Sequence, residues 1–233
     1  MLNKKIKHIS NLIIVSLILI VSLFSFLPER AITISSGESY RAIYNGDRDS
    51  KYVSLMINVY ENGEVVKEML DLFKEEGVVA TFFVGGCWAD DNCEILKRII
   101  NEGHELGNHG YFHKDHKKLS ENSNYNEIYN CDKIVSSLTG YKMTLFAPPS
   151  GSFSKTTLKI AKNLGYQTIM WSKDTIDWRD SDVNVIVSRA TKSVEGGDFI
   201  LMHPKPHTLS ALFEIIKIIK QKGLSFSTVS DLL

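Results

Sequence analysis

The feature that most constrains the fold is the regular alternation of short apolar segments with longer amphipathic ones, from residue 52 to the C-terminus. The short segments predict strands at 52–58, 78–84, 104–109, 143–146, 168–171, 199–203 and 224–229. The amphipathic segments predict helices at 65–76, 92–101, 125–138, 155–164, 183–193 and 210–221, several of which end at a glycine. Elements that alternate in this way form parallel sheets with crossover helices. The sequence therefore predicts an α/β protein, either an open doubly wound sheet or a barrel.

Composition sets the size of the protein and the kinds of partner it can have. The chain has 233 residues and a formal net charge of zero, which suits one α/β domain with a sizeable core. There is no excess of basic residues, so we expect no nucleic-acid partner. We also expect a monomer. We assign the domain to residues 51–233, and we assign residues 28–50 to a polar linker with one short strand near residues 41–44.

The N-terminal segment, residues 1–27, has the pattern of an export signal. Lys4, Lys5 and Lys7 precede an apolar run at residues 12–27. Positive charge before a short apolar core is typical of a signal peptide or a signal anchor, and the positive end stays in the cytoplasm. No clear small-x-small cleavage site follows, so we predict an uncleaved membrane anchor. The expected location is the cell membrane, single-pass, with the domain outside; a cleaved signal would make the protein secreted instead.

The three cysteines leave two alternatives open. Cys87 and Cys93 could close a small disulfide loop outside the cell, which would leave Cys131 as a free thiol. Alternatively, all three are small buried or loop residues. No C-x-x-C pair occurs, so a metal site built from cysteines is not expected.

Two histidines four residues apart, His109 and His113, lie at the end of a predicted strand. On a helix, or on a turn that enters one, this spacing places both imidazoles on one face. Imidazole is a common ligand of zinc, and two rings on one face make half of a tetrahedral site. The pair therefore predicts a divalent-metal site, although the spacing alone is also compatible with coincidence.

A second group of polar and aromatic residues follows two later strands. Asp174, Asp177 and Trp178 come after one predicted strand, and His203 ends another. A carboxylate bonded to an imidazole fixes its tautomer and lets the ring act as a general acid, while an indole offers a flat apolar face to a sugar. Taken singly, each residue has a structural explanation as a helix cap, a core tryptophan or a satisfied histidine. Because the carboxyl ends of parallel strands meet at one edge, we expect the group to share one site with the histidine pair.

Five ordered motifs span most of the predicted domain. Besides the H-x-x-x-H array, they are V-V-A-T-F-F-V-G-G at 78–86, A-P-P-S-G at 147–151, D-T-I-D-W at 174–178 and L-M-H at 201–203. Together they resemble the motifs of the polysaccharide deacetylases, carbohydrate esterase family 4, whose shared unit is the NodB homology domain. The resemblance implies that Pro149 and Trp178 contact a cell-wall glycan.

The resemblance also implies a fold and a reaction. The family fold is a distorted (β/α)7 barrel, and its enzymes remove N-acetyl groups from amino sugars of peptidoglycan or chitin. A divalent metal, zinc by preference with cobalt or manganese as alternatives, would be held by His109 and His113. His203, oriented by Asp177, would protonate the leaving amine.

The first motif departs from the family pattern. In the family it reads T-F-D-D-G, where the first aspartate is the general base and the second is a metal ligand. The distance to the 78–86 segment places Asn58 in the catalytic base position and Val59 in the ligand position. Ala147 replaces the arginine that braces the base in the family, and without the base such an arginine would be an unpaired buried charge. The base half of the site is therefore predicted to be dismantled.

Three alternatives for removing the proton from water and two for the function remain. A second alignment places Glu61 at the base position, Asp115 is another carboxylate that could take the proton, and a bound metal could itself make the water acidic enough to lose it. Removing a general base lowers a rate by about 10²–10⁴-fold. The first function is therefore a metal-dependent N-deacetylase with reduced activity, and the alternative is a catalytically inactive protein of the same fold that binds cell-wall glycan.

Overall fold

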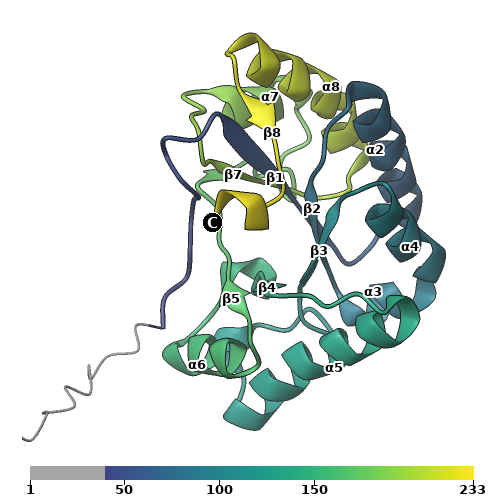
Figure 1. Cartoon of the computed structure of the whole chain (residues 1–233), viewed down its shortest axis with the longest axis vertical. Coiled ribbons are helices and arrows are strands. Elements are labelled where there is room, and N and C mark those ends of the chain that lie inside the picture. Colours follow the sequence, from purple (N-terminus) through teal and green to yellow (C-terminus); the bar gives the residue numbers. More distant parts are fainter. Residues whose placement is uncertain (1–39) are drawn as a thin grey trace, which may run out of the picture. The chain divides into compact units, whose positions relative to one another are not determined.

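A parallel β-sheet forms the centre of the structure, a computed structural model that describes residues 40–233 (Figure 1). Seven strands are paired in the order β5-β4-β3-β2-β1-β7-β6, and an eighth pairs with the beginning of β1. The strands are β1 (Tyr52–Val59), β2 (Thr81–Val84), β3 (Glu105–Asn108), β4 (Leu145–Phe146), β5 (Gln167–Thr168), β6 (Lys173–Asp174), β7 (Phe199–Met202) and β8 (Ser225–Phe226). The α/β class and the parallel pairing predicted from the sequence are confirmed.

Helices flank the sheet on its outer side (Figure 1). They are α2 (Gly63–Glu76), α3 (Gly86–Asp91), α4 (Cys93–Asn101), α5 (Glu121–Thr139), α6 (Lys155–Asn163), α7 (Val183–Thr191) and α8 (Pro206–Gln221), with 3-10 turns η1 (His116–Lys118), η2 (Pro149–Gly151) and η3 (Ser230–Leu232). Helix α2 shows why they form: Val66, Met69 and Phe73 recur at helical spacing and are all buried. It ends at Gly77, whose φ of 62° is a left-handed conformation that glycine adopts without strain.

The two faces of β1 contribute to two apolar clusters. Leu55, Ile57 and Val59 belong to the large cluster that includes the helices, whereas Met56 belongs to a smaller cluster on the other face. Side chains alternate between the faces of a strand. Asn58 therefore lies on the same face as Met56, at the carboxyl end of the strand.

The C-terminal segment covers the amino end of the sheet. Val229 donates its N–H to Thr81 Oγ1 at 2.8 Å, and Ser230 donates its N–H to Glu105 Oε2 at 3.2 Å. Thr81 and Glu105 are the first residues of β2 and β3, and Leu232 lies in the smaller apolar cluster. This arrangement leaves the carboxyl end of the sheet for the site.

Several predicted boundaries differ from the structure. Two elements, α3 and β6, were not predicted, because they are six and two residues long and carry too little periodicity. The strand expected near residues 41–44 is reduced to isolated bridges, Ile43 with Ile169 and Asn45 with Asp198. The compact unit begins at Tyr40, whereas the predicted domain begins at residue 51.

The predicted membrane anchor at residues 1–27 lies outside the described residues. Among residues 40–233, no helix has the length and apolar character needed to cross a membrane.

Candidate active site

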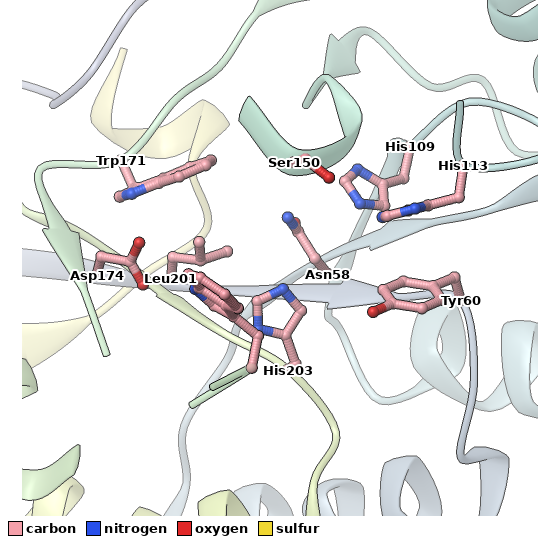
Figure 2. Close-up of a pocket in the computed structure, with 10 residues that line it drawn as sticks. Asn58, Tyr60, His109, His113, Ser150, Trp171, Asp174, Leu201 and His203 are labelled. Carbon is pink, nitrogen blue, oxygen red and sulfur yellow. The ribbon is translucent and has the colours of Figure 1, made fainter. Parts of the chain in front are cut away.

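A pocket of about 280 Å³ opens at the carboxyl end of the sheet (Figure 2). Its side chains come from the ends of strands or from the loops that follow them, as parallel sheets arrange their sites. The lining residues are Asn58, Tyr60, His109, His113, Ser150, Trp171, Asp174, Trp178, Leu201 and His203. The pocket thus brings together the histidine pair, the later histidine, Asn58 and Trp178 from distant parts of the sequence.

His109 directly follows β3 and is fixed in orientation. Its N–H donates to Val84 O at 3.0 Å, and its ring Nδ1 lies 2.7 Å from the Ala147 carbonyl oxygen. Because a carbonyl only accepts, Nδ1 carries the hydrogen and Nε2 keeps a free lone pair. That Nε2 is buried and has no partner among residues 40–233. This is the protonation state in which imidazole binds a metal or accepts a hydrogen bond.

Neither a helix nor a helical turn carries the H-x-x-x-H array. The array is an irregular loop between β3 and η1, in which His113 has a left-handed φ of 56°. The two rings nevertheless lie close together, with centroids 5.0 Å apart, and Tyr60 packs on His113 at 4.1 Å. Loop geometry, rather than helical spacing, therefore brings the imidazoles together.

Both rings of the pair are uncharged at neutral pH. Burial holds the pKa of His109 well below its ordinary value, and the neighbouring His113 adds to this effect. Burial, followed by the charge of His203, also lowers the pKa of His113. The floor of the pocket is therefore a neutral, acceptor-bearing surface.

The loop that carries the pair is held by a residue that sequence reasoning missed. Glu127 on α5 is buried, and its Oε2 accepts the N–H groups of Tyr111 at 3.0 Å and Phe112 at 2.8 Å. Lys114 lies 3.4 Å from its other oxygen. The sequence does carry a signal for Glu127, because it directly precedes Ile128 on the buried stripe of a predicted helix. A carboxylate buried there without a partner is costly, so a partner is expected.

His203 and Asp177 form the predicted pair. The Asp177 Oδ1 lies 2.7 Å from His203 Nδ1, and Oδ2 accepts the His203 N–H and the Thr208 hydroxyl, both at 2.7 Å. Burial alone would raise the pKa of Asp177, but the hydrogen bonds and the charge of His203 outweigh it and lower that pKa. The carboxylate therefore stays ionised and fixes the orientation of the imidazole.

The base half of the site carries no carboxylate. Asn58 lines the pocket, is 3% exposed, and leaves its Oδ1 without a partner among the described residues. Val59 is fully buried in the large apolar cluster, and Ala147 is fully buried in the smaller one. Apolar side chains surround both positions, an environment in which valine and alanine are stable.

The two carboxylates proposed as replacements are engaged elsewhere. Glu61 forms an ion pair with Lys205, and Asp115 accepts hydrogen bonds from Ser152 and pairs with Lys118. Neither Glu61 nor Asp115 lines the pocket. The geometry therefore gives no support to either as the base.

The residues of the pocket do not fit a catalytic metal site. Catalytic zinc sites use three protein ligands and one open position. The unpartnered Nε2 of His109 suits one ligand position, and His113 lies beside it. Within residues 40–233, however, no group of three or more His, Cys, Asp or Glu could hold a metal ion.

Of the two residues predicted to contact glycan, Trp178 lines the pocket and Pro149 does not. Trp178 lines the pocket and is 55% exposed, so its indole face is available to a ligand. Pro149 is buried and is not part of the lining, whereas the adjacent Ser150 is. Trp171, labelled in Figure 2, is a further aromatic residue of the pocket lining that sequence reasoning did not single out.

All three cysteines are free in the structure. Cys87 is exposed, Cys93 is half-buried and Cys131 is buried. The disulfide loop between Cys87 and Cys93 that the sequence left open is not closed.

Comparison with known proteins identifies a family and several relatives. Residues 45–169 match the polysaccharide deacetylase family. The uncharacterized protein YlxY of Bacillus subtilis is 37% identical over 191 residues, which cover 82% of this chain but only 60% of that protein. A peptidoglycan-N-acetylglucosamine deacetylase of Bacillus cereus is 32% identical over 200 residues, covering 84% of this chain and 73% of the relative.

Solved structures agree with the sequence comparison. The crystal structure of a CE4 family pseudoenzyme from Bacillus anthracis superposes with a TM-score of 0.80 at 35% identity, covering 83% of this chain and 69% of that one. A mutant of that pseudoenzyme with restored enzymatic activity gives the same TM-score. The barrel of the deacetylase type predicted from the motifs is therefore confirmed. The chain belongs to the polysaccharide deacetylase family.

Proposed function

We propose that the domain binds N-acetylated cell-wall glycan in this pocket and lacks the hydrolytic activity of its deacetylase relatives. The observation that carries the proposal is Asn58, a buried neutral amide that lines the pocket at the position predicted for the base. An asparagine side chain does not accept a proton from water at neutral pH. Loss of a general base costs about 10²–10⁴-fold in rate.

Metal chemistry supplies no alternative route. With two imidazoles and no third protein ligand within residues 40–233, the site does not fit a catalytic zinc centre. The position next to Asn58 is Val59, whose side chain is apolar and fully buried. Base and ligand are therefore both missing, and we derive no hydrolytic step through a metal.

The features needed for binding persist. The pocket has walls of aromatic rings, including the exposed Trp178 and the neighbouring Trp171. Pockets with an apolar wall and a few convergent polar groups are the usual sites for small ligands. The named B. cereus relative acts on peptidoglycan N-acetylglucosamine, which supports a glycan of this class as the ligand.

One observation favours the second candidate, a slow deacetylase. His203 and Asp177 form the 2.7 Å contact that a general acid needs for its orientation. If a different base assembled when substrate binds, this pair would be ready to protonate a leaving amine.

Co-sedimentation with purified N-acetylated peptidoglycan tests binding. We expect the full-length protein to bind saturably and Trp178→Ala to bind several-fold more weakly, because an aromatic contact is worth about 0.5–1.5 kcal/mol. Phe213→Ala is the matched control, since Phe213 is an equally exposed aromatic, 51% against 55%, that lies outside the pocket lining. Binding that both variants leave unchanged would show that this pocket is not the glycan site.

We also propose that residues 1–27 hold the domain outside the cytoplasmic membrane. The support is the lysine-flanked apolar run in the sequence. Fractionation of cells and sequencing of the mature N-terminus test it. We expect an intact N-terminus in the membrane fraction, and a mature chain that begins near Arg30 in the culture medium would contradict the anchor.

A further inference from the structure

Tyr60 brings a side chain into the pocket at a position where the family motif has none. It follows Val59, so it stands where T-F-D-D-G ends in a glycine. The side chain lines the pocket, and the residue is 38% exposed, so a ligand can reach it. A tyrosine offers an apolar ring and a hydroxyl that donates or accepts a hydrogen bond. Tyr60 therefore gives this pocket a donor that a glycine lacks.

The ring of Tyr60 extends from the histidine pair into the pocket. Its centroid lies 4.1 Å from that of the His113 ring, with 33° between the two planes. Figure 2 shows the hydroxyl pointing away from His113 and towards His203. Within residues 40–233 this hydroxyl makes no hydrogen bond. The fold therefore fixes the ring and leaves the hydroxyl available to a ligand.

Two contacts hold the loop that carries Tyr60. Glu61 forms an ion pair with Lys205. Asn62 donates from Nδ2 to the Pro204 carbonyl oxygen at 2.9 Å. Both partners lie in the loop between β7 and α8, across the pocket from the histidine pair in sequence and structure. Tyr60 is therefore held in place before a ligand arrives, which reduces the entropy cost of binding.

The hydroxyl of Tyr60 keeps its proton at neutral pH. Burial raises the pKa of Tyr60, the negative charge of Glu61 raises it further, and Lys205 offsets only part of this effect. A protonated hydroxyl donates well to an uncharged oxygen such as the carbonyl of an acetamido group. Tyr60 is thus suited to bind the polar part of an N-acetylated sugar.

We propose that Tyr60 is a ligand-binding residue whose hydroxyl donates a hydrogen bond to the acetamido carbonyl oxygen of the glycan, so that binding in this pocket needs no metal ion. In metal-dependent hydrolases a metal ion polarises such a carbonyl. Within residues 40–233 no group of three or more His, Cys, Asp or Glu could hold that ion, whereas Tyr60 supplies a neutral donor. The inference rests on the proposed function, which places the glycan in this pocket.

Calorimetric titration of the full-length protein with tetra-N-acetyl-chitotetraose tests the role of the hydroxyl. Tyr60→Phe removes the hydroxyl and keeps the ring, and we expect it to weaken binding about three- to tenfold. Tyr125→Phe is the matched control, because Tyr125 is equally exposed, 39% against 38%, and lies outside the pocket lining. The control should bind as tightly as the wild-type protein.

The same titration in the presence of a chelator, and again with added zinc, tests the role of a metal. We expect the wild-type protein to bind the oligosaccharide with the same affinity in both conditions. Affinity that falls in the chelator and returns with zinc would overturn the proposal, because a metal ion would then hold the ligand. Thermal unfolding followed by circular dichroism verifies that each variant is folded.

The outcomes separate this inference from the proposed function. Binding that Tyr60→Phe weakens and Tyr125→Phe leaves unchanged supports the role of Tyr60. Equal binding by the wild-type protein and Tyr60→Phe, or equal weakening by the two variants, overturns that role while the proposed function stands. If the wild-type protein binds neither this oligosaccharide nor purified peptidoglycan, both are overturned.

Discussion

Three buried side chains, Asn58, Val59 and Ala147, account for the missing half of the site, and they depend on one another. Ala147 lies in an apolar cluster where an arginine would need a carboxylate partner, and Asn58 offers none. A buried charge without its partner costs about 3–5 kcal/mol. Single reversions therefore create a new defect, and the three positions are best treated as one unit.

We predict that Asn58→Asp, Val59→Asp and Ala147→Arg restore deacetylation together and not singly. In the family pattern these three residues are the base, a metal ligand and the arginine that braces the base, so acetate release from the triple variant should rise by at least about 100-fold. Ala147→Arg alone should lower the free energy of unfolding by about 3 kcal/mol. The activity-restoring mutant of the similar pseudoenzyme shows that repair is possible in this fold. A folded triple variant without activity would indicate that Asn58 is not at the base position, and Glu61→Gln would then be the variant to assay.

We predict that the protein binds zinc weakly. Because residues 40–233 contain no group of three or more His, Cys, Asp or Glu that could hold a metal ion, we expect zinc to bind far more weakly than to a three-ligand site. Calorimetric titration of chelator-treated protein measures this, and His109→Ala should abolish the remaining signal. Tight zinc binding that persists in His109→Ala would contradict a site built on His109 and His113.

At the scale of elements, the H-x-x-x-H loop depends on a helix that is distant in sequence. Glu127 of α5 accepts two backbone N–H groups of the loop, from Tyr111 and Phe112. Periodicity predicted α5 itself, because its apolar stripe is local information. It did not predict the loop conformation, which is set by tertiary hydrogen bonds and by the left-handed His113. The helical spacing considered for the two histidines therefore does not apply.

We predict that Glu127→Ala destabilises the protein by at least about 2 kcal/mol. The change leaves two partly buried backbone donors without their acceptor, and an unpaired donor costs about 1–3 kcal/mol where it is fully buried and less where water reaches it. Urea unfolding measures the change in free energy. Glu121→Ala, at an exposed position in the first turn of the same helix, should cost less than about 0.5 kcal/mol. Equal effects of the two substitutions would contradict the role of Glu127 in holding the loop.

At the scale of the whole molecule, the repeating pattern determined most of what the sequence could predict. The order of strands and helices, the carboxyl-end location of the site and the family all followed from local periodicity and ordered motifs. The short elements β6 and α3 did not, because two and six residues give no periodic signal. The buried Oδ1 of Asn58, which has no hydrogen-bond partner among the described residues, and the hydrogen bonds of Glu127 to the loop could not be predicted either. Both depend on how distant segments pack together.

Buried histidines make the stability of the molecule depend on pH. Burial lowers the pKa of His104 to about 4 and also lowers those of His109 and His116. These rings are neutral when folded but take up protons when unfolded below about pH 6.5, so the stability they contribute is present above that pH and lost as the pH falls towards 4. We predict that the free energy of unfolding drops between pH 7 and pH 5.

The contribution of His104 to the pH dependence of stability can be measured separately. Its Nδ1 accepts the Ala80 N–H at 3.1 Å, and an asparagine oxygen can replace that acceptor without titrating. Urea unfolding of His104→Asn should therefore show a shallower pH dependence than the wild-type protein. Parallel curves for the two proteins would contradict the assignment.

We propose that the pocket binds cell-wall glycan and lacks the base needed for hydrolysis. Acetate release from N-acetylated chitooligosaccharides and peptidoglycan, measured with added zinc, cobalt or manganese beside the B. cereus deacetylase, tests it most directly. The account predicts a rate at least about 100-fold below that of the active relative with every metal. A comparable rate for the wild-type protein would contradict it and would show that another group replaces the base at Asn58.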